Sequence, residues 1–229
     1  MNVQEATTRR LPDLKERHLP ENCRETINTI LKETYGYEQF RNLEIYDDLS
    51  KGKEKLCISQ GQLIENVILE AEKAWKSETQ VDNILLTAPT GSGKSLLFQL
   101  PAIYLGKEYN LLTIVVSPLK ALIVDQVESL QELGYARVAY ASSDLSPEQK
   151  MEVYRQVREG EIDLFYLSPE LLLSYDIKHF VGERRIGLVV VDEAHTVTTW
   201  GKEFRVDYWF LGRYLTALKQ TLGYNFPLF

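Results

Sequence analysis

A loop of small residues that ends in lysine and serine carries the clearest chemical signal in this sequence. The run Ala88-Pro89-Thr90-Gly91-Ser92-Gly93-Lys94-Ser95 follows the apolar residues 84–87 and precedes a helix-forming stretch. Glycines at 91 and 93 allow backbone N–H groups to turn toward phosphate oxygens, Lys94 can reach the β- and γ-phosphates, and the Ser95 hydroxyl can ligate Mg²⁺. We therefore predict a nucleotide site formed by Thr90, Gly91, Ser92, Gly93, Lys94 and Ser95.

Two adjacent carboxylates complement this loop. The apolar run 187–191 ends in Asp192-Glu193-Ala194-His195. A strand that delivers two carboxylates at its end can direct Asp192 toward a metal ion and Glu193 toward an attacking water, as its general base. The alternative is an acidic helix N-terminus. We predict Lys94, Asp192, Glu193 and His195 as catalytic residues, with Ser95 and Asp192 as metal ligands.

The elements that would position these residues follow an alternating pattern. Short β-branched runs alternate with helical stretches, which predicts a mostly parallel sheet with helices on both faces, an α/β fold. The predicted strands are Ile84–Thr87, Thr113–Ser117, Arg137–Ala141, Asp163–Leu167 and Leu188–Val191. Serine–proline pairs begin three helices, at Ser117, Ser146 and Ser168, with serine as the N-cap and proline as the first helical residue. The first and third pairs lie at the carboxyl edge of the sheet, where ligands bind.

The region before the phosphate loop is predicted to be helical and irregular. Residues 1–24 form an arm, residues 25–34 a short helix closed by Gly36, and residues 62–77 an amphipathic helix. We expect three parts: the arm 1–24, a lead-in 25–82, and a lobe 83–229.

Composition narrows the class of protein. The 229 residues carry 26 Lys+Arg against 33 Asp+Glu, a net charge of −7, which argues against a broad basic clamp for nucleic acid. Cys23 and Cys57 form no CxxC pair, and three histidines support no zinc cluster. No apolar run spans a bilayer and no signal peptide begins the chain, so we expect a cytoplasmic protein without a membrane partner.

At this point the residues resemble superfamily 2 helicases of the DEAH type, and the RecQ family most closely. The resemblance implies a RecA-like P-loop NTPase lobe that uses ATP and Mg²⁺. Residues 31–41 resemble the adenine-binding motif of that family, whose aromatic and arginine are matched by Tyr37 and Arg41. Glu44 stands where the family has glutamine. Gln62 can supply that amide if residues 42–61 are an insertion, and both readings remain open.

Three further segments resemble DNA-contacting motifs of the family: residues 117–126, 166–170 and 196–208. Serine-capped helix N-termini present N–H groups to DNA phosphates, and aromatic side chains stack on bases. The last segment has Lys202 and Glu203 where the family has histidine and aspartate, and its aromatic residues could instead lie in the core. The residues that we predict to bind DNA are Ser117, Pro118, Lys120, Gln126, Ser168, Pro169, Trp200, Lys202, Phe204 and Arg205.

The resemblance implies the first motor lobe of an ATP-dependent 3′-to-5′ DNA helicase. Its expected partners are single-stranded or partly duplex DNA and a second RecA-like lobe of the same parent protein, and we expect a monomer. The chain ends just before the strand that carries the Ser/Thr-Ala-Thr motif of the family, so we expect a fragment of low activity by itself. Two alternatives remain open: an RNA helicase or duplex translocase of the same superfamily, and a non-catalytic nucleotide-sensing or docking module.

Overall fold

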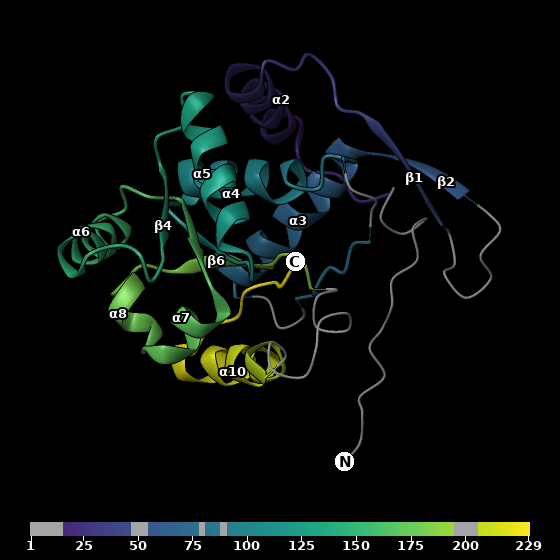
Figure 1. The fold of residues 1–229 in the computed structure, drawn as a ribbon. Helices are drawn as coiled ribbons and strands as arrows, with labels where there is room; N and C mark the ends of the chain where they lie inside the picture. Colours follow the sequence, from purple (N-terminus) through teal and green to yellow (C-terminus); the bar gives the residue numbers. More distant parts are fainter. Residues whose placement is uncertain (1–15, 47–54, 78–80, 88–90, 195–205) are drawn as a thin grey trace.

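A parallel four-stranded sheet forms the centre of the molecule (Figure 1). The computed structural model describes residues 16–46, 55–77, 81–87, 91–194 and 206–229. The strand order is β4-β5-β3-β6, and all three pairings are parallel. The strands are β3 (Leu112–Val116), β4 (Val138–Ala141), β5 (Leu164–Leu167) and β6 (Ile186–Val191). Four of the five predicted runs are therefore strands, and the predicted α/β fold is confirmed.

The remaining run, residues 84–87, does not form a strand. The Ile84 N–H donates to the carbonyl oxygen of Leu228 at 2.7 Å, but no ladder follows. Residues 227–229 in turn lie beside β6, where the Phe229 N–H donates to the Val189 carbonyl and the Val191 N–H to the Phe229 carbonyl, at 2.9 and 2.8 Å. The prediction was wrong because an apolar run needs a partner of similar length to become a strand. Ile84 therefore contacts Leu228, which in turn forms a single bridge to Val189 of β6.

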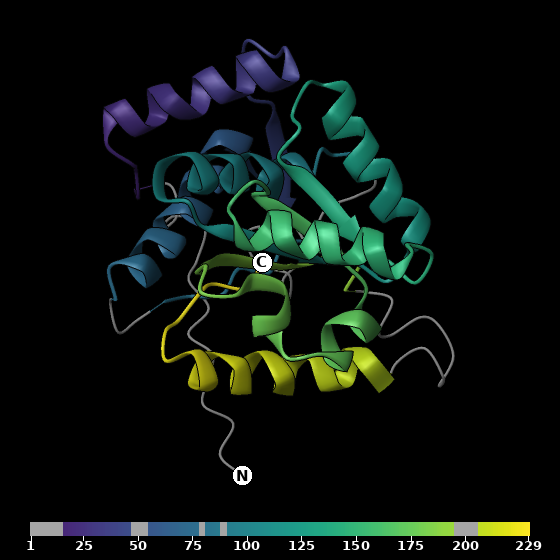
Figure 2. The same cartoon turned by 90° about the vertical axis from the view of Figure 1, so that its left-hand side faces the viewer.

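Successive strand residues face opposite sides and divide the core in two. On one side, Val115, Tyr166 and Val190 pack under four helices: α2 (Glu21–Tyr35), α3 (Gln60–Trp75), α4 (Leu96–Tyr109) and α5 (Lys120–Glu132). The other side is covered by α6 (Pro147–Arg158), α7 (Pro169–Ser174), α8 (Ile177–Val181) and α10 (Val206–Leu222). Figure 2 shows α2 and α10 at opposite ends of these layers. The prediction of helices on both faces is confirmed.

The lead-in contains a β-hairpin that the sequence did not predict. The strands β1 (Asn42–Tyr46) and β2 (Lys55–Ser59) pair antiparallel, with Asn42 opposite Ser59. The helix α2 begins at Glu21 rather than residue 25, and it ends at Gly36, whose φ is 68°, as predicted. The helix α3 begins at Gln60 rather than 62, because Ser59 caps it. Apolar spacing identifies the buried face of a helix, but capping bonds determine its first residue.

Two of the three predicted serine caps are present. The Ser146 Oγ accepts a hydrogen bond from the Gln149 N–H at 3.2 Å, and the Ser168 Oγ accepts one from the Leu171 N–H at 3.3 Å. Ser117 is not a cap, because α5 begins at Lys120. The Ser117 N–H instead donates to the Leu167 carbonyl at 3.1 Å. Pairing with β5 keeps this serine in the sheet, so the predicted helix start was wrong.

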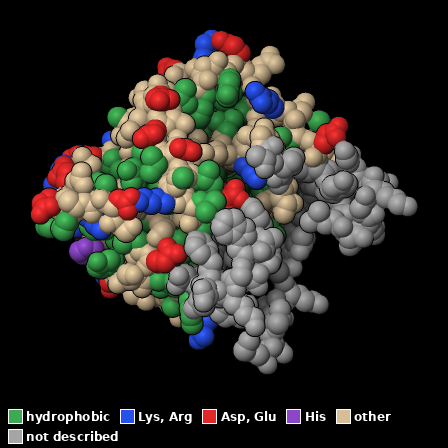
Figure 3. Space-filling model, viewed as in Figure 1, with side chains coloured by type: hydrophobic (Ala, Val, Ile, Leu, Met, Phe, Trp, Pro, Cys, Tyr) green, Lys and Arg blue, Asp and Glu red, His purple; other side chains and the backbone are tan. Residues whose placement is uncertain are grey.

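The surface carries charges of both signs. On the face seen in Figure 3, acidic and basic side chains are interspersed among hydrophobic ones, without a broad basic area. This distribution agrees with the net charge of −7. No helix in the ranges that the structure describes is long and apolar enough to cross a membrane.

A buried ionic cluster joins three elements at the edge of the sheet opposite the phosphate loop. The Asp163 carboxylate accepts hydrogen bonds from Tyr135, Arg137 and Arg184 at 2.7 to 3.0 Å. Asp163 and Arg184 are almost fully buried, and burial lowers the pKa of the Arg184 guanidinium although Asp163 opposes this effect. Gly106 of α4 lies against this carboxylate, where a Cβ atom would overlap the Asp163 Cγ. Close approach of α4 to the cluster therefore requires glycine.

We expect Gly106→Ala to destabilise the fold by about 1–3 kcal/mol, because the added methyl group must displace a buried ionic cluster. Gly212, on α10, is the matched control, since a Cβ atom there would meet nothing within 4 Å. Gly212→Ala should stabilise the protein by up to about 1 kcal/mol, the difference in helix propensity. Urea denaturation of both variants measures these changes. Equal effects at the two positions would contradict the role of Gly106.

Glu70 attaches the approach to the phosphate loop to α3. Its carboxylate accepts hydrogen bonds from Arg17 Nη2 at 2.6 Å, Lys73 Nζ at 2.9 Å and the Asp82 N–H at 2.8 Å. Burial by itself raises the pKa of this carboxyl, but the three hydrogen bonds outweigh burial and hold the pKa below its ordinary value of 4.5. The charged form of Glu70 therefore stabilises the fold.

This depressed pKa predicts an acid-dependent loss of stability. The contribution of Glu70 is fully present above pH 4.5, the ordinary value, and is lost as the pH falls through the lower pKa of the folded state. We expect the difference in unfolding free energy between the natural protein and Glu70→Gln to shrink as the pH falls below 4.5. Urea denaturation at a series of pH values measures it, with exposed Glu132→Gln as control. A difference that does not change with pH would refute the role of the charge.

Candidate nucleotide site

The described part of the predicted phosphate loop contains two glycines in the left-handed region. Gly91 and Gly93 have φ angles of +80° and +76°, in the region that favours glycine. The helix α4 follows at once, and the Gln99 N–H donates to the Ser95 carbonyl at 2.9 Å. Ser95 is the N-cap residue, yet its side chain makes no capping bond. Its hydroxyl thus fits the predicted role of metal ligand. Thr90 lies outside the residues that the structure describes, as do Ala88 and Pro89.

The acidic pair lies where β6 ends. The Asp192 N–H donates to the Val116 carbonyl at 2.9 Å, which extends the pairing of β6 with β3 by one residue. The Glu193 N–H donates to Asp192 Oδ1 at 2.9 Å. Glu193 has a φ of 51°, a left-handed conformation that costs a non-glycine residue about 1–3 kcal/mol. Strain of this kind gathers at functional sites, and here it falls on the predicted base. His195 lies outside the described ranges.

An aromatic and an arginine face each other in the predicted base-binding segment. The Tyr37 ring is 47% exposed and stacks on Tyr35, with ring centroids 6.4 Å apart and planes 17° apart. The Arg41 Cζ lies 5.9 Å from the Tyr37 ring centroid. An exposed ring beside a guanidinium offers a face on which a planar base can stack. Glu44 lies in β1, at the register position opposite Cys57.

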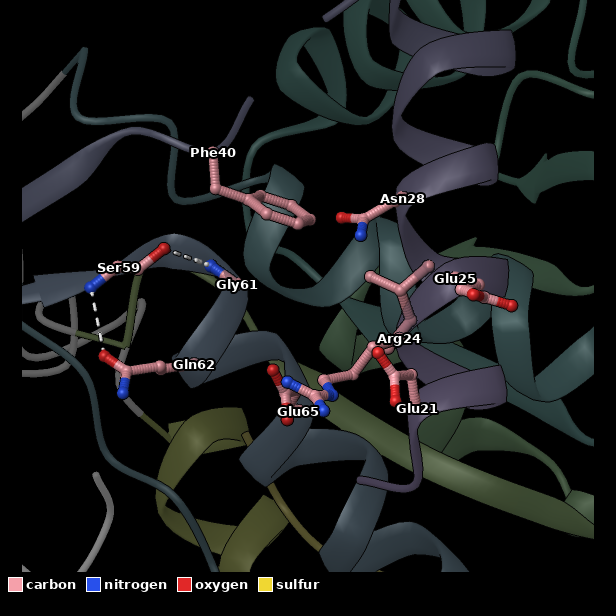
Figure 4. A pocket seen from close by; sticks show the side chains of 10 residues that line it. Glu21, Arg24, Glu25, Asn28, Phe40, Ser59, Gly61, Gln62 and Glu65 are labelled. Atoms are coloured by element: carbon pink, nitrogen blue, oxygen red, sulfur yellow. Dashed lines mark hydrogen bonds between the residues drawn. The ribbon is translucent and has the colours of Figure 1, made fainter. Parts of the chain in front are cut away.

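Gln62 is the third residue of α3, and its amide turns toward the helix start. Its Oε1 accepts a hydrogen bond from the Ser59 N–H at 3.4 Å, in a capping box with Ser59 (Figure 4). Phe40 lies over Gly61, where a Cβ atom would come within 2.8 Å of the ring. These side chains line a cavity of about 280 Å³ between α2 and the start of α3. The prediction that Gln62 reads adenine stays a prediction.

A different glutamine, which the sequence analysis missed, touches the phosphate loop. Gln60 is 2% exposed, and its Nε2 donates to the Ser92 carbonyl at 3.3 Å. Its Oε1 accepts from the Arg41 N–H at 3.1 Å, and its own N–H donates to the Arg41 carbonyl at 2.9 Å. One residue therefore joins the base-binding segment to the phosphate loop. The signal in the sequence was the pair of glutamines around Gly61, which gives no means of choosing between them.

The residues predicted to bind DNA are only partly accessible. The side chains of Ser117, Pro118 and Pro169 are buried, so they shape the edge of the sheet rather than its surface. Lys120 forms an ion pair with Asp144. The backbone bonds of Ser117 and Asp192 described above bring the ends of β5, β3 and β6 together, and Ser168 follows β5.

The remaining DNA-binding predictions divide into two groups. Gln126 turns inward, and its Oε1 accepts from Gln99 Nε2 at 2.8 Å. The other predicted residues lie outside the described part of the chain: Trp200, Lys202, Phe204 and Arg205.

The sequence predicts two protein ligands for the metal ion, Ser95 and Asp192. Within the ranges described, no three His, Cys, Asp or Glu side chains gather to hold a metal ion. A magnesium ion that binds a nucleotide takes most of its ligands from phosphate oxygens and water. Ser95 and Asp192 therefore fit such an ion, whereas a metal site built only from protein ligands is not present in these ranges.

Comparison with known proteins identifies a family and several relatives of this chain. The family model described as DEAD/DEAH box helicase matches residues 69–223. An ATP-dependent DNA helicase RecQ of Synechocystis is 34% identical over 202 residues, covering 87% of this chain and 35% of that protein. The RecQ helicase of Haemophilus influenzae is 30% identical over 187 residues, covering 82% and 25%. The chain thus spans about a third or less of the length of these relatives. The UvsW helicase of bacteriophage T4 aligns with a TM-score of 0.47 and 18% identity, over 81% of this chain and 55% of that one.

The two glutamines can be separated by experiment. We expect Gln60→Ala to weaken ATP binding about tenfold, since it removes two hydrogen bonds that hold the loop to the base-binding segment. Gln62→Ala is the matched control. It removes a capping box and should cost about 1 kcal/mol of stability with little change in affinity. Calorimetric titration with ATP and GTP measures both variants. If Gln62→Ala alone weakens binding and abolishes the preference for ATP, Gln62 reads the base and Gln60 does not.

Proposed function

Because the chain belongs to the DEAD/DEAH box helicase family, and its relatives include RecQ helicases, we propose that it is the ATP-binding motor lobe of a 3′-to-5′ DNA helicase. In this proposal residues 83–229 form the first RecA-like lobe, residues 25–82 the lead-in that binds the base, and residues 1–24 an arm. A second RecA-like lobe completes the motor. The polarity follows from the resemblance to RecQ helicases.

One arrangement supports this proposal above all others. The segment before the phosphate loop and the strand before the acidic pair both bond to residues 227–229. Ile84 pairs with Leu228, and residues 227–229 pair with β6, which ends at Asp192. In a parallel sheet the carboxyl ends of the strands form the edge where nucleotides bind. A glycine-rich turn with an incidental lysine would not require an acidic pair at that edge.

Each residue of the site then has a role. Backbone N–H groups of Gly91 to Ser95 and the Lys94 ammonium would hold the phosphates of ATP, and Tyr37 and Arg41 the base. Ser95 and Asp192 would hold Mg²⁺, which supplies charge neutralisation at the phosphate oxygens. Glu193 would orient a water molecule and accept its proton. Gln60 keeps the base-binding and phosphate-binding parts in register.

DNA is the proposed partner on the same edge of the sheet. The Ser168 hydroxyl caps α7, whose N-terminal backbone N–H groups rather than surplus lysines would contact the phosphates, whereas Ser117 follows β3 with its N–H bonded to the Leu167 carbonyl. Lys120 would have to leave Asp144 to contact DNA. Trp200, Phe204 and Arg205 would stack on or pair with single-stranded DNA, as the resemblance implies. We expect such contacts to bind single-stranded DNA weakly until a second lobe closes over the DNA.

Substitutions of Lys94 in the phosphate loop and of Glu193, the proposed general base, supply the decisive test. In the protein that carries both lobes, we expect Lys94→Ala and Glu193→Gln each to lower DNA-stimulated ATP hydrolysis by about 10²–10⁴-fold. Lys94→Ala removes a phosphate contact and should also weaken ATP binding, whereas Glu193→Gln should leave binding nearly unchanged. Exposed residues at the far end of α4 provide matched controls, Lys107→Ala and Glu108→Gln. Steady-state hydrolysis and calorimetric titration measure both properties.

Three other results would overturn the proposal. Undiminished hydrolysis in both variants would remove these residues from the reaction. Absence of ATP–Mg²⁺ binding at millimolar concentrations would indicate a docking module. Stronger stimulation by RNA than by DNA would indicate an RNA helicase.

A further inference from the structure

A buried glutamine joins four elements that surround the site. Gln99 lies in α4, four residues after Ser95, and is 5% exposed. Its Oε1 accepts a hydrogen bond from the Tyr35 hydroxyl of α2 at 3.2 Å. Its Nε2 donates to Gln126 Oε1 of α5 at 2.8 Å and to the Tyr166 hydroxyl of β5 at 3.2 Å. Both N–H groups of one amide are therefore used, each toward a different element.

The partners of Gln99 belong to different parts of the proposed machinery. Tyr35 stacks on Tyr37, the exposed ring of the base-binding segment. Gln126 lies on α5, the helix that follows β3 and begins at Lys120. Tyr166 lies two residues before Ser168, in the predicted DNA-contacting segment 166–170. Gln99 itself belongs to the helix that the phosphate loop begins.

The bonds of Gln99 are directional, since the Tyr35 hydroxyl donates to its Oε1 and the Tyr166 hydroxyl accepts from its Nε2. Burial raises the pKa of the Tyr35 hydroxyl, so it keeps its proton and donates. Burial also raises the pKa of the Tyr166 hydroxyl, and the charge of Asp192 acts in the same direction, although the bond from Gln99 opposes both. A buried amide that loses one partner leaves a polar group unsatisfied. A shift of α5 or β5 relative to α4 must therefore either break these bonds or move Gln99 with it.

We propose that Gln99 is a positioning residue that couples DNA contact along α5 and the end of β5 to ATP hydrolysis at the phosphate loop. This inference rests on the proposed function. DNA bound against these segments would bias their position, and the amide transmits that bias to α4 and to Tyr35. Gln99 contacts neither ligand. Its loss should therefore change the stimulation by DNA and not the binding of nucleotide.

The test compares DNA stimulation with basal turnover in the protein that carries both lobes. For Gln99→Leu we expect the ratio of kcat with and without an oligodeoxythymidine strand to fall about fivefold or more. The basal kcat and the KM for ATP should stay within about twofold of their natural values. Gln131→Leu is the matched control and should have no effect, because Gln131 is exposed near the end of α5, the helix that carries Gln126.

Tyr166→Phe and Tyr35→Phe keep the test decisive if Gln99→Leu does not fold. Each removes one hydroxyl and one hydrogen bond to Gln99 without changing the packing volume much. We expect Tyr166→Phe to lower DNA stimulation, and the double variant with Gln99→Leu to be no worse than Gln99→Leu alone, because both changes remove the same bond. Normal stimulation in Gln99→Leu or in Tyr166→Phe would overturn the inference and leave the proposed function intact. Absence of any DNA-stimulated hydrolysis in the natural protein would instead overturn the proposed function.

Discussion

The pairing of β3 with strands on both sides is the constraint on which the rest of the structure depends. Its carboxyl end is held twice, by the Ser117 N–H on the Leu167 carbonyl and by the Asp192 N–H on the Val116 carbonyl. Both bonds lie where β5, β3 and β6 end, so the segments that follow these three strands begin at fixed positions relative to one another. Because buried backbone groups must be paired, the carboxyl ends of the three strands cannot shift relative to one another without losing these bonds. The acidic pair and both serine segments keep their spacing for this reason.

The hairpin β1–β2 lengthens the chain between the base-binding segment and α3 without separating them in space. Antiparallel pairing returns the chain to its starting point, so that Gln60 lies beside Arg41 although 19 residues separate them. The amide of Gln60 then reaches Ser92, 32 residues further along. Gly93 also lies against this amide, with room for no side chain. Insertion in a surface loop costs little free energy when its ends remain adjacent.

Local sequence pattern predicted four of the five strands, and it failed where a residue's distant partners determine its structure. Four β-branched runs became strands because each found a neighbour of similar length, whereas residues 84–87 found only Leu228. The Ser117–Pro118 pair has the composition of a helix start, but pairing with β5 takes its N–H into the sheet. Gln60 and Gln62 flank one glycine, and only the return of the hairpin determines which one touches the loop. Hydrogen bonds between residues 19 to 67 positions apart, such as those of Gln60 and Gln99, cannot be predicted from the spacing of residue types along the chain.

An acidic chain can hold anionic ligands because the charge that matters is local. With a net charge of −7 the whole molecule repels phosphate weakly, and salt screens that repulsion over about 10 Å. At the proposed site, the N-terminus of α4 and Lys94 would present positive charge at contact distance from a phosphate, where screening has little effect. In the proposed site the Glu193 and Asp192 carboxylates would oppose a free phosphate, so a bound divalent cation would be needed to balance them. Under the proposed function, the same balance would disfavour tight binding of DNA by backbone groups alone, and binding that depends on closure of a second lobe would be released with each nucleotide.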